Sequence, residues 1–265
     1  MDHPSSVPLP HRHFLDRAVP LLARDPRVVG IAAGGSYAEN AMDACSDIDL
    51  LLVCEPSEHA ALMQHRTTLA SQLGPLVAAF TGEHVGEPRL LICLYGPPAL
   101  HVDIKVVTPA DLASRTDDAV VLWDRCASIR RAVSTPKVGS GAPDAQWIEE
   151  RFWVWVHYGA LKIERGELQE ALDFLSYLRV SVLGPLGLQR HGLKPYGVRR
   201  VENNPELAAQ LASTVGGLER AALIAALENA INLYLGLRPD SVQRRQEAQE
   251  VALDHVEQMK RRLVH

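Results

Sequence analysis

The spacing of apolar and polar residues changes character near residue 135. Before that point, short apolar runs of strand length alternate with helical patterns, and after it nearly the whole chain has helical spacing. Residues 57–73 have the pattern of a helix, with Ser57 in a position to cap its start. Four runs predict strands, at residues 28–33, 49–53, 90–95 and 102–107. Short buried strands mixed with helices favour an α/β sandwich with a small mixed sheet.

The second half predicts a bundle of amphipathic helices. Helical spacing covers residues 144–164, 168–182, 205–214, 218–235 and 241–263. The run LGPLGL at 183–188 is expected to end the second of these helices, because Gly and Pro interrupt helical patterns. Residues 134–143 are rich in Gly, Pro and Ser and predict a linker. We therefore expect two domains, 1–135 and 136–265.

Composition restricts the class of protein. Of the 265 residues 47% are apolar and 22% charged, which excludes a mainly disordered chain. Lys and Arg number 27 against 32 Asp and Glu, and this net charge of −5 argues against nucleic acid as the main partner. The N-terminal residues lack the apolar region of a signal peptide, and the apolar runs are too short to cross a membrane. Four scattered cysteines argue against a disulfide scaffold or a structural zinc site and favour a cytoplasmic location: Cys45, Cys54, Cys93 and Cys126.

The residues with the clearest chemical pattern lie between the first two predicted strands. The first strand ends in Gly34-Gly35-Ser36, where two glycines let backbone N–H groups approach a phosphate closely and the serine hydroxyl adds a donor. Asp47 and Asp49 are two residues apart at the start of the second strand, so their carboxylates share one face. Two adjacent carboxylates repel each other unless a cation lies between them, and Mg²⁺ suits such a pair together with phosphate oxygens.

A third acid lies within the fourth predicted strand. Asp103 alternates with apolar neighbours, as do His101 and Lys105 on the same face. If this strand neighbours the one that carries Asp49, the three acids form a cluster able to hold two metal ions. The alternative is a solvent-facing position on an edge strand.

The combination of Gly34-Gly35-Ser36, ten intervening residues, Asp47-Ile48-Asp49 and the later Asp103 resembles the signature of the nucleotidyltransferase superfamily. The helical second half is similar in layout to the antibiotic nucleotidyltransferases that adenylylate streptomycin, kanamycin and lincosamides. The resemblance implies an α+β protein, with a small mixed-sheet nucleotidyltransferase domain over residues 1–135. An all-α helical bundle that binds the acceptor substrate would follow over residues 136–265.

The resemblance also implies a mechanism. ATP or another nucleoside triphosphate would bind with Mg²⁺ on Asp47 and Asp49, and the Gly34, Gly35 and Ser36 turn would contact its β- and γ-phosphates. A hydroxyl of a small molecule, such as an aminoglycoside-like antibiotic, would attack the α-phosphorus and release pyrophosphate. Asp103 would complete a second metal site or act as the catalytic base. Glutamates of the helical half are alternative bases: Glu149, Glu150, Glu164 and Glu167.

One departure from the pattern concerns the residues after Ser36. Related sequences often carry a basic residue or glycine there, whereas this chain has Tyr37-Ala38-Glu39-Asn40. Two other functions fit the motif: adenylylation of a protein, as by the much shorter nucleotidyltransferase antitoxins, and nucleotide binding without catalysis. We expect a nucleoside triphosphate and a small acceptor as partners, with no nucleic acid and no membrane, and the sequence leaves the oligomeric state open.

Overall fold

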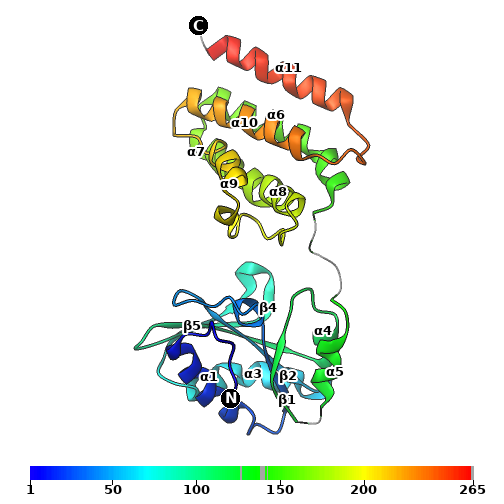
Figure 1. Ribbon diagram of the computed structural model, residues 1–265. Helices are drawn as coiled ribbons and strands as arrows, with labels where there is room; N and C mark the ends of the chain where they lie inside the picture. The colour runs from blue at the N-terminus through cyan, green and yellow to red at the C-terminus, as the bar shows by residue number, and fades with distance from the viewer. Residues whose placement is uncertain (126, 138–140, 142, 264–265) are drawn as a thin grey trace. The chain divides into compact units, whose positions relative to one another are not determined.

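The chain divides into two compact units in the computed structural model, which describes residues 1–125, 127–137, 141 and 143–263. The units are Met1–Val138 and Gly139–His265 (Figure 1). The first is a mixed β-sheet with helices and the second is helical, which confirms the α+β prediction. Residues 138–140 and 142 of the expected linker lie outside the described residues, as does Cys126. The other three cysteines are free thiols.

The sheet of the first unit has six strands in the order β3-β4-β5-β2-β1-β6. β2 and β5 are parallel, and every other neighbouring pair among the described strands is antiparallel. The strands are β1 Val28–Ala33, β2 Ile48–Cys54, β3 Leu76–Gly82, β4 Glu87–Tyr95, β5 Leu100–Val107 and β6 Val120–Asp124. All four strands predicted from the sequence are present. The sequence did not predict the two edge strands, β3 and β6, whose residues are mostly exposed or half-buried.

Helices cover both faces of this sheet. α1 (Leu9–Leu22) and α3 (His59–Gln72) pack on one face, around a core that includes Phe14, Leu50 and Ile104. α4 (Pro109–Ala113) and α5 (Ser128–Ser134) cover Val53 and Val107 on the other face. Since side chains alternate along a strand, Asp49 shares this second face with Val53.

The predicted cap at Ser57 is wrong. Ser57 lies within a 3₁₀ turn, η1 (Pro56–Glu58), and α3 begins only at His59 without a side-chain cap. Pro56 occupies the first position of η1, where its fixed φ and missing N–H are tolerated. The turn therefore starts before the serine rather than at it.

The helical unit packs around its own apolar core. Its longer helices are α6 Ala145–Arg165, α7 Leu168–Leu178, α10 Arg220–Leu237 and α11 Gln246–Leu263. The shorter elements are η3 Arg179–Leu183, α8 Gly184–Arg190, η4 Val201–Asn203 and α9 Pro205–Ala212. Phe152 and Trp153 of α6 are buried in this core, and the Phe152 ring stacks on Tyr234 of α10 with 3.7 Å between centroids.

The expectation that LGPLGL ends the helix after α7 is also wrong. A wider π-helical turn, η3, joins α7 to α8, and Pro185 lies in the first turn of α8. A proline in a first turn has no intrahelical N–H bond to lose, so the chain can remain helical through it. The stretch Leu168–Arg190 is long and apolar enough for a membrane span by composition, but 56% of its most apolar window is buried inside the protein. The cytoplasmic location stays a prediction.

Candidate functional site

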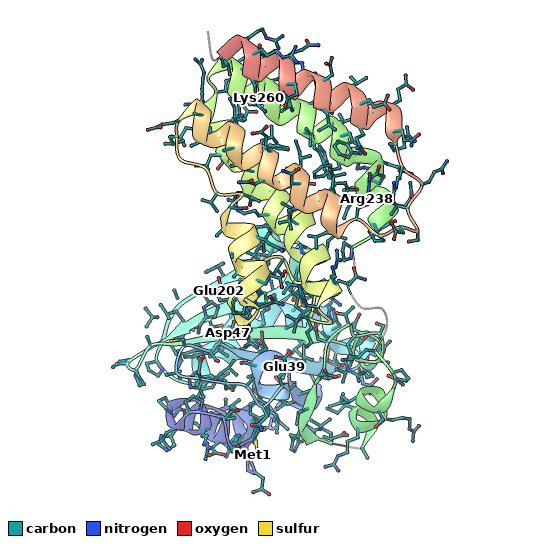
Figure 2. All side chains as sticks on the ribbon, turned by 45° about the horizontal axis from the view of Figure 1, so that its top comes forward. Met1, Glu39, Asp47, Glu202, Arg238 and Lys260 are labelled. Carbon is teal, nitrogen blue, oxygen red and sulfur yellow. The ribbon has the colours of Figure 1, made fainter. Side chains whose placement is uncertain are left out.

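Three carboxylates meet on the sheet of the first unit. Asp49 of β2 lies directly opposite Asp103 of β5 in the parallel pair, and Asp47 immediately precedes β2. One ligand atom from each of the three lies within 4.8 Å of the others, and all three residues are half-buried. In the part of the chain that the structure describes, this is the one such group of acidic, histidine or cysteine side chains. We call it the acidic cluster; Figure 2 labels Asp47.

The position of Asp103 contradicts the edge-strand alternative. β5 lies inside the sheet, between β4 and β2. A carboxylate on an inner strand beside two others is electrostatically unfavourable unless a cation offsets the repulsion. Its place in the sheet therefore supports a role in binding.

The glycine turn approaches the same cluster. Gly35 begins the short helix α2 (Gly35–Ala38) with a φ of +52°, and a β-carbon built on it would overlap Oδ2 of Asp49. The N–H of Gly34 donates to the carbonyl of Asp49 at 3.0 Å, which joins the turn to β2. Glycine suits this position because its φ is positive and because any β-carbon would force Oδ2 of Asp49 to move.

Ser36 follows in this turn with an unused hydroxyl. The residue is 9% exposed, and its Oγ has no hydrogen-bond partner among the described residues. Buried hydroxyls are usually hydrogen-bonded, so this one is a donor available to a ligand that binds at the turn. Glu39, the residue that departs from the family pattern, directly follows α2 and is exposed (Figure 2).

Two histidines support the acidic cluster, and sequence reasoning assigned a role to neither. His11 of α1 is 2% exposed, and its Nε2 donates to the carbonyl of Ser46 at 2.8 Å, which fixes the backbone just before Asp47. His101 of β5 is exposed, and its Nε2 lies 3.0 Å from Oδ1 of Asp103. The alternation of His101 with Asp103 along β5 was visible in the sequence, but no sequence signal indicated His11.

Burial raises the pKa of Asp103 above its ordinary value of 3.8. His101 opposes this rise in pKa through its charge and hydrogen bond, whereas the nearby carboxylate of Asp47 adds to it. The charged form of Asp103 is therefore disfavoured until a cation arrives, and the protonated form is easier to reach than for an ordinary aspartate.

The donor set fits Mg²⁺. Carboxylate oxygens, together with phosphate oxygens and water, are the ligands that this ion prefers, and three carboxylates can share two ions. Gly35 lies against Oδ2 of Asp49, and the unpartnered Ser36 hydroxyl follows it in the chain. Asp47, Asp49 and Asp103 would hold the metal.

The four glutamates named as alternative bases all have partners in the helical unit. Glu149 is fully buried and accepts hydrogen bonds from Trp153, Tyr234, Arg238 and the backbone of Arg245. Burial tends to raise its pKa, but these hydrogen bonds outweigh that effect and hold the pKa below its ordinary value of 4.5. Glu149 is therefore a structural carboxylate.

The other three glutamates form ion pairs nearer the surface of the helical unit. Glu150 lies 3.4 Å from Arg151, Glu164 lies 2.5 Å from Arg262, and Glu167 lies 2.7 Å from Lys162. Each of these carboxylates is already paired with a cation of the helical unit. Asp103, which lies within the acidic cluster, therefore remains the candidate base.

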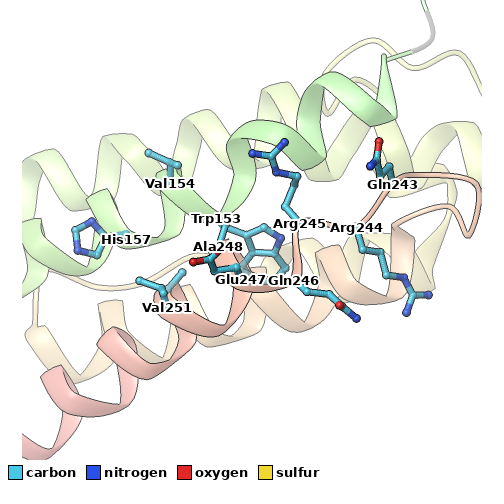
Figure 3. A pocket seen from close by; sticks show the side chains of 11 residues that line it. Trp153, Val154, His157, Gln243, Arg244, Arg245, Gln246, Glu247, Ala248 and Val251 are labelled. Atoms are coloured by element: carbon cyan, nitrogen blue, oxygen red, sulfur yellow. The ribbon is translucent and has the colours of Figure 1, made fainter.

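The helical unit also carries a groove of about 650 Å³ between α6 and the start of α11 (Figure 3). Trp153 and Ala252 are its buried lining residues, while Val154 and Val251 are more than 60% exposed beside it. The polar lining residues are mostly amides and arginines, together with His157 and Glu247. Since the lining contains no cluster of metal-ligating groups, the acidic cluster remains the candidate site.

Comparison with protein-family models and with curated proteins finds no match. Among solved structures, the chain is similar to an aminoglycoside 6-adenyltransferase from Bacillus subtilis (13% identity over 94% of this chain and 95% of that one, TM-score 0.37). It is also similar to a nucleotidyltransferase-like protein from Exiguobacterium sibiricum 255-15 (12% identity over 91% and 76%, TM-score 0.38). A third similar structure is the STING-associated CdnE c-di-GMP synthase from Capnocytophaga granulosa (14% identity over 94% of this chain and 78% of that one, TM-score 0.31).

At TM-scores below 0.5 and identities below 15%, such likenesses assign no residue roles to this chain. The function proposed next rests on the geometry of the acidic cluster itself.

Proposed function

We propose that this protein is a Mg²⁺-dependent nucleotidyltransferase that transfers AMP from ATP to a hydroxyl group of a small molecule and releases pyrophosphate. The proposal rests on the positions of Asp47, Asp49 and Asp103, each of which has a carboxylate oxygen within 4.8 Å of those of the other two. Bound Mg²⁺ would neutralise charge on the phosphates and on the attacking and leaving oxygens.

The residues of the glycine turn would bind the leaving half of the nucleotide. Gly35 leaves room for a phosphate oxygen close to the backbone, and the Ser36 hydroxyl is available to donate to it. Positioning of this kind is the main contribution that a protein makes to phosphoryl transfer. The turn therefore fixes the direction in which pyrophosphate departs.

Asp103 would accept the proton of the attacking hydroxyl. As the oxygen–phosphorus bond forms at the α-phosphorus, the bond to pyrophosphate breaks and the hydroxyl proton passes to the Asp103 carboxylate. The Asp103 carboxylate lies directly opposite Asp49, within the acidic cluster where the reacting oxygens would bind. His101, hydrogen-bonded to Asp103 and 53% exposed, would then pass the proton to solvent.

Incubation with ATP labelled at the α-phosphate, Mg²⁺ and a panel of hydroxyl compounds that includes aminoglycosides tests this proposal. We expect Mg²⁺-dependent pyrophosphate release and a labelled product. Asp49→Asn should abolish both, whereas Asp16→Asn, on the exposed part of α1, should not. Mg²⁺-dependent ATP binding without turnover on any acceptor would favour a catalytically silent relative, and undiminished turnover by Asp49→Asn would contradict the proposal.

A further inference from the structure

A row of paired residues runs from the acidic cluster across the sheet to its β3 edge. Asp49 pairs with Asp103, Asp103 with Ile92 of β4, and Ile92 with Phe80 of β3. Directly paired residues in neighbouring strands point to the same face of a sheet. The two carboxylates and the two apolar side chains therefore lie on one face, in a single line.

Two side chains at the apolar end of this face are open to solvent. Phe80 is 55% exposed, and Leu94, two residues from Ile92 on the same face, is 43% exposed, whereas Ile92 itself is 9% exposed. The Phe80 ring lies beside the ring of His84 in the 3₁₀ turn η2 (Glu83–Val85), with 5.6 Å between ring centroids. Farther along this face, α4 and α5 cover Val53 and Val107. We call Phe80, Ile92 and Leu94 the apolar shelf.

The shelf lies within reach of a molecule that reacts at the acidic cluster. Neighbouring strands are about 4.8 Å apart, so Ile92 lies about 5 Å and Phe80 about 10 Å from Asp103 along the row. None of the three shelf residues carries a charge. A polycation such as an aminoglycoside would find no carboxylate there to receive its ammonium groups.

The shelf and the glycine turn lie on opposite sides of the acidic cluster. The turn follows β1, which neighbours β2 on the side away from β5, whereas the shelf lies beyond β5 on β4 and β3. In an in-line displacement at phosphorus, the attacking and leaving oxygens are on opposite sides of the phosphorus atom. If pyrophosphate departs toward the turn, the acceptor must approach from the side of the shelf.

We propose that the acceptor is a hydroxyl compound with an uncharged, apolar body, an aromatic ring or branched alkyl group within about 10 Å of the reacting oxygen. The shelf binds that body. This inference rests on the proposed function for the reaction, and on the strand register for the position of the shelf.

Methyl NMR on the full chain, with Mg²⁺ and a non-hydrolysable ATP analogue present, tests the shelf directly. The probe is 2-phenylethanol, and kanamycin is the polycationic comparison. We expect saturable shifts of the Ile92 and Leu94 methyl groups with 2-phenylethanol. Phe80→Ser should weaken this binding at least fivefold, while Leu9→Ser, at another exposed apolar position on α1, should not change it.

The inference would be overturned if Phe80→Ser bound 2-phenylethanol as tightly as the wild-type chain does. It would also be overturned if the shifted methyl groups lay outside the shelf, or if kanamycin bound the shelf more tightly than 2-phenylethanol. Shelf shifts produced by the ATP analogue alone would assign the shelf to the nucleobase and would also overturn it. Each of these results concerns binding and does not require turnover.

A transfer assay with the same alcohols separates this inference from the proposed function. We expect kcat/KM for 2-phenylethanol to exceed that for ethylene glycol at least tenfold, and the advantage to fall in Phe80→Ser. Shelf binding without any transfer would refute the proposed function and leave an apolar ligand site. Transfer with no preference for the apolar alcohol would refute the acceptor class and leave the proposed function standing.

Discussion

Replacement of Gly35 by alanine should weaken Mg²⁺ binding at least tenfold and destabilise the fold no more than a strained glycine replacement elsewhere in the same unit. At a φ of +52°, alanine adopts a left-handed conformation that costs about 1–2 kcal/mol. The added β-carbon would also overlap Oδ2 of Asp49, and an ordinary contact begins only at 3.4 Å, so this oxygen must retreat by more than an ångström. Bonds to Mg²⁺ are about 2.0–2.1 Å long and their geometry is strict, so the carboxylate would no longer bind the ion.

Two matched variants separate backbone strain from this overlap. Gly86→Ala has the same strain, with a φ of +74° and nothing within 4 Å of its β-carbon. Gly34→Ala has a negative φ and an ordinary contact of 3.7 Å with Cβ of Asp49. Gly35 and Gly86 variants should both lose about 1–2 kcal/mol in urea denaturation, and Gly34→Ala should lose less.

Calorimetric titration with Mg²⁺ and the non-hydrolysable ATP analogue provides the decisive comparison. Affinity should fall at least tenfold, or about 1.4 kcal/mol, in Gly35→Ala only. Wild-type affinity in Gly35→Ala, or an equal loss in Gly86→Ala, would refute the idea that this glycine makes room for the Asp49 carboxylate.

Three further predictions concern the histidines and the buried glutamate. His11→Ala should weaken Mg²⁺ binding severalfold and destabilise the first unit by about 1 kcal/mol, because it leaves the half-buried Ser46 carbonyl without its donor. His11→Gln, which keeps an N–H donor, should restore part of both, and equal behaviour of the two variants would argue against the hydrogen bond. Tyr234→Phe should cost about 1.5–3 kcal/mol in denaturant unfolding, because it removes a hydrogen bond at 2.6 Å to the charged Glu149; a smaller loss would show that the remaining donors suffice. Burial, together with the charge of His157, lowers the pKa of His255 below its ordinary value of 6.5, so the unfolded chain binds a proton more readily than the folded chain. This contribution to stability is complete above about pH 6.5 and is lost as the pH falls through the lower folded pKa, so His255→Gln should flatten the dependence of the urea midpoint on pH in this range, and an unchanged slope would contradict it.

The sequence predicted the inner strands of the sheet well because their side chains follow a simple rule. In β2 and β5, apolar residues fill one face and the acids interrupt the other, a pattern that local periodicity detects. The edge strands β3 and β6 escaped detection because exposed edges need no regular apolar face. The continuation of α7 into α8 was missed because Gly and Pro indicate a break, and only the surrounding packing decides whether a wider turn can absorb them.

The sequence identified the acids of the candidate site, but it did not establish that all three come together in the fold. Asp47 and Asp49 are close in the chain, so their shared face follows from strand geometry alone. The meeting with Asp103 depends on β5 pairing with β2, a contact between distant segments that no local pattern encodes. His11 could not be found at all, because its partner is a backbone carbonyl, and any residue at position 46 would supply one.

The parallel pairing of β2 with β5 also determines where this chain can tolerate insertions and deletions. The pairs run without a bulge from Ile48 and Val102 to Val53 and Val107, and successive residues alternate between faces. A single residue lost within β5 ahead of Asp103 would turn that carboxylate toward the core beneath α1 and α3. An added residue in the β3–β4 turn, at residues 83–86, would leave the strand register untouched. Divergent relatives should therefore vary in length at such turns and keep the lengths of these two strands.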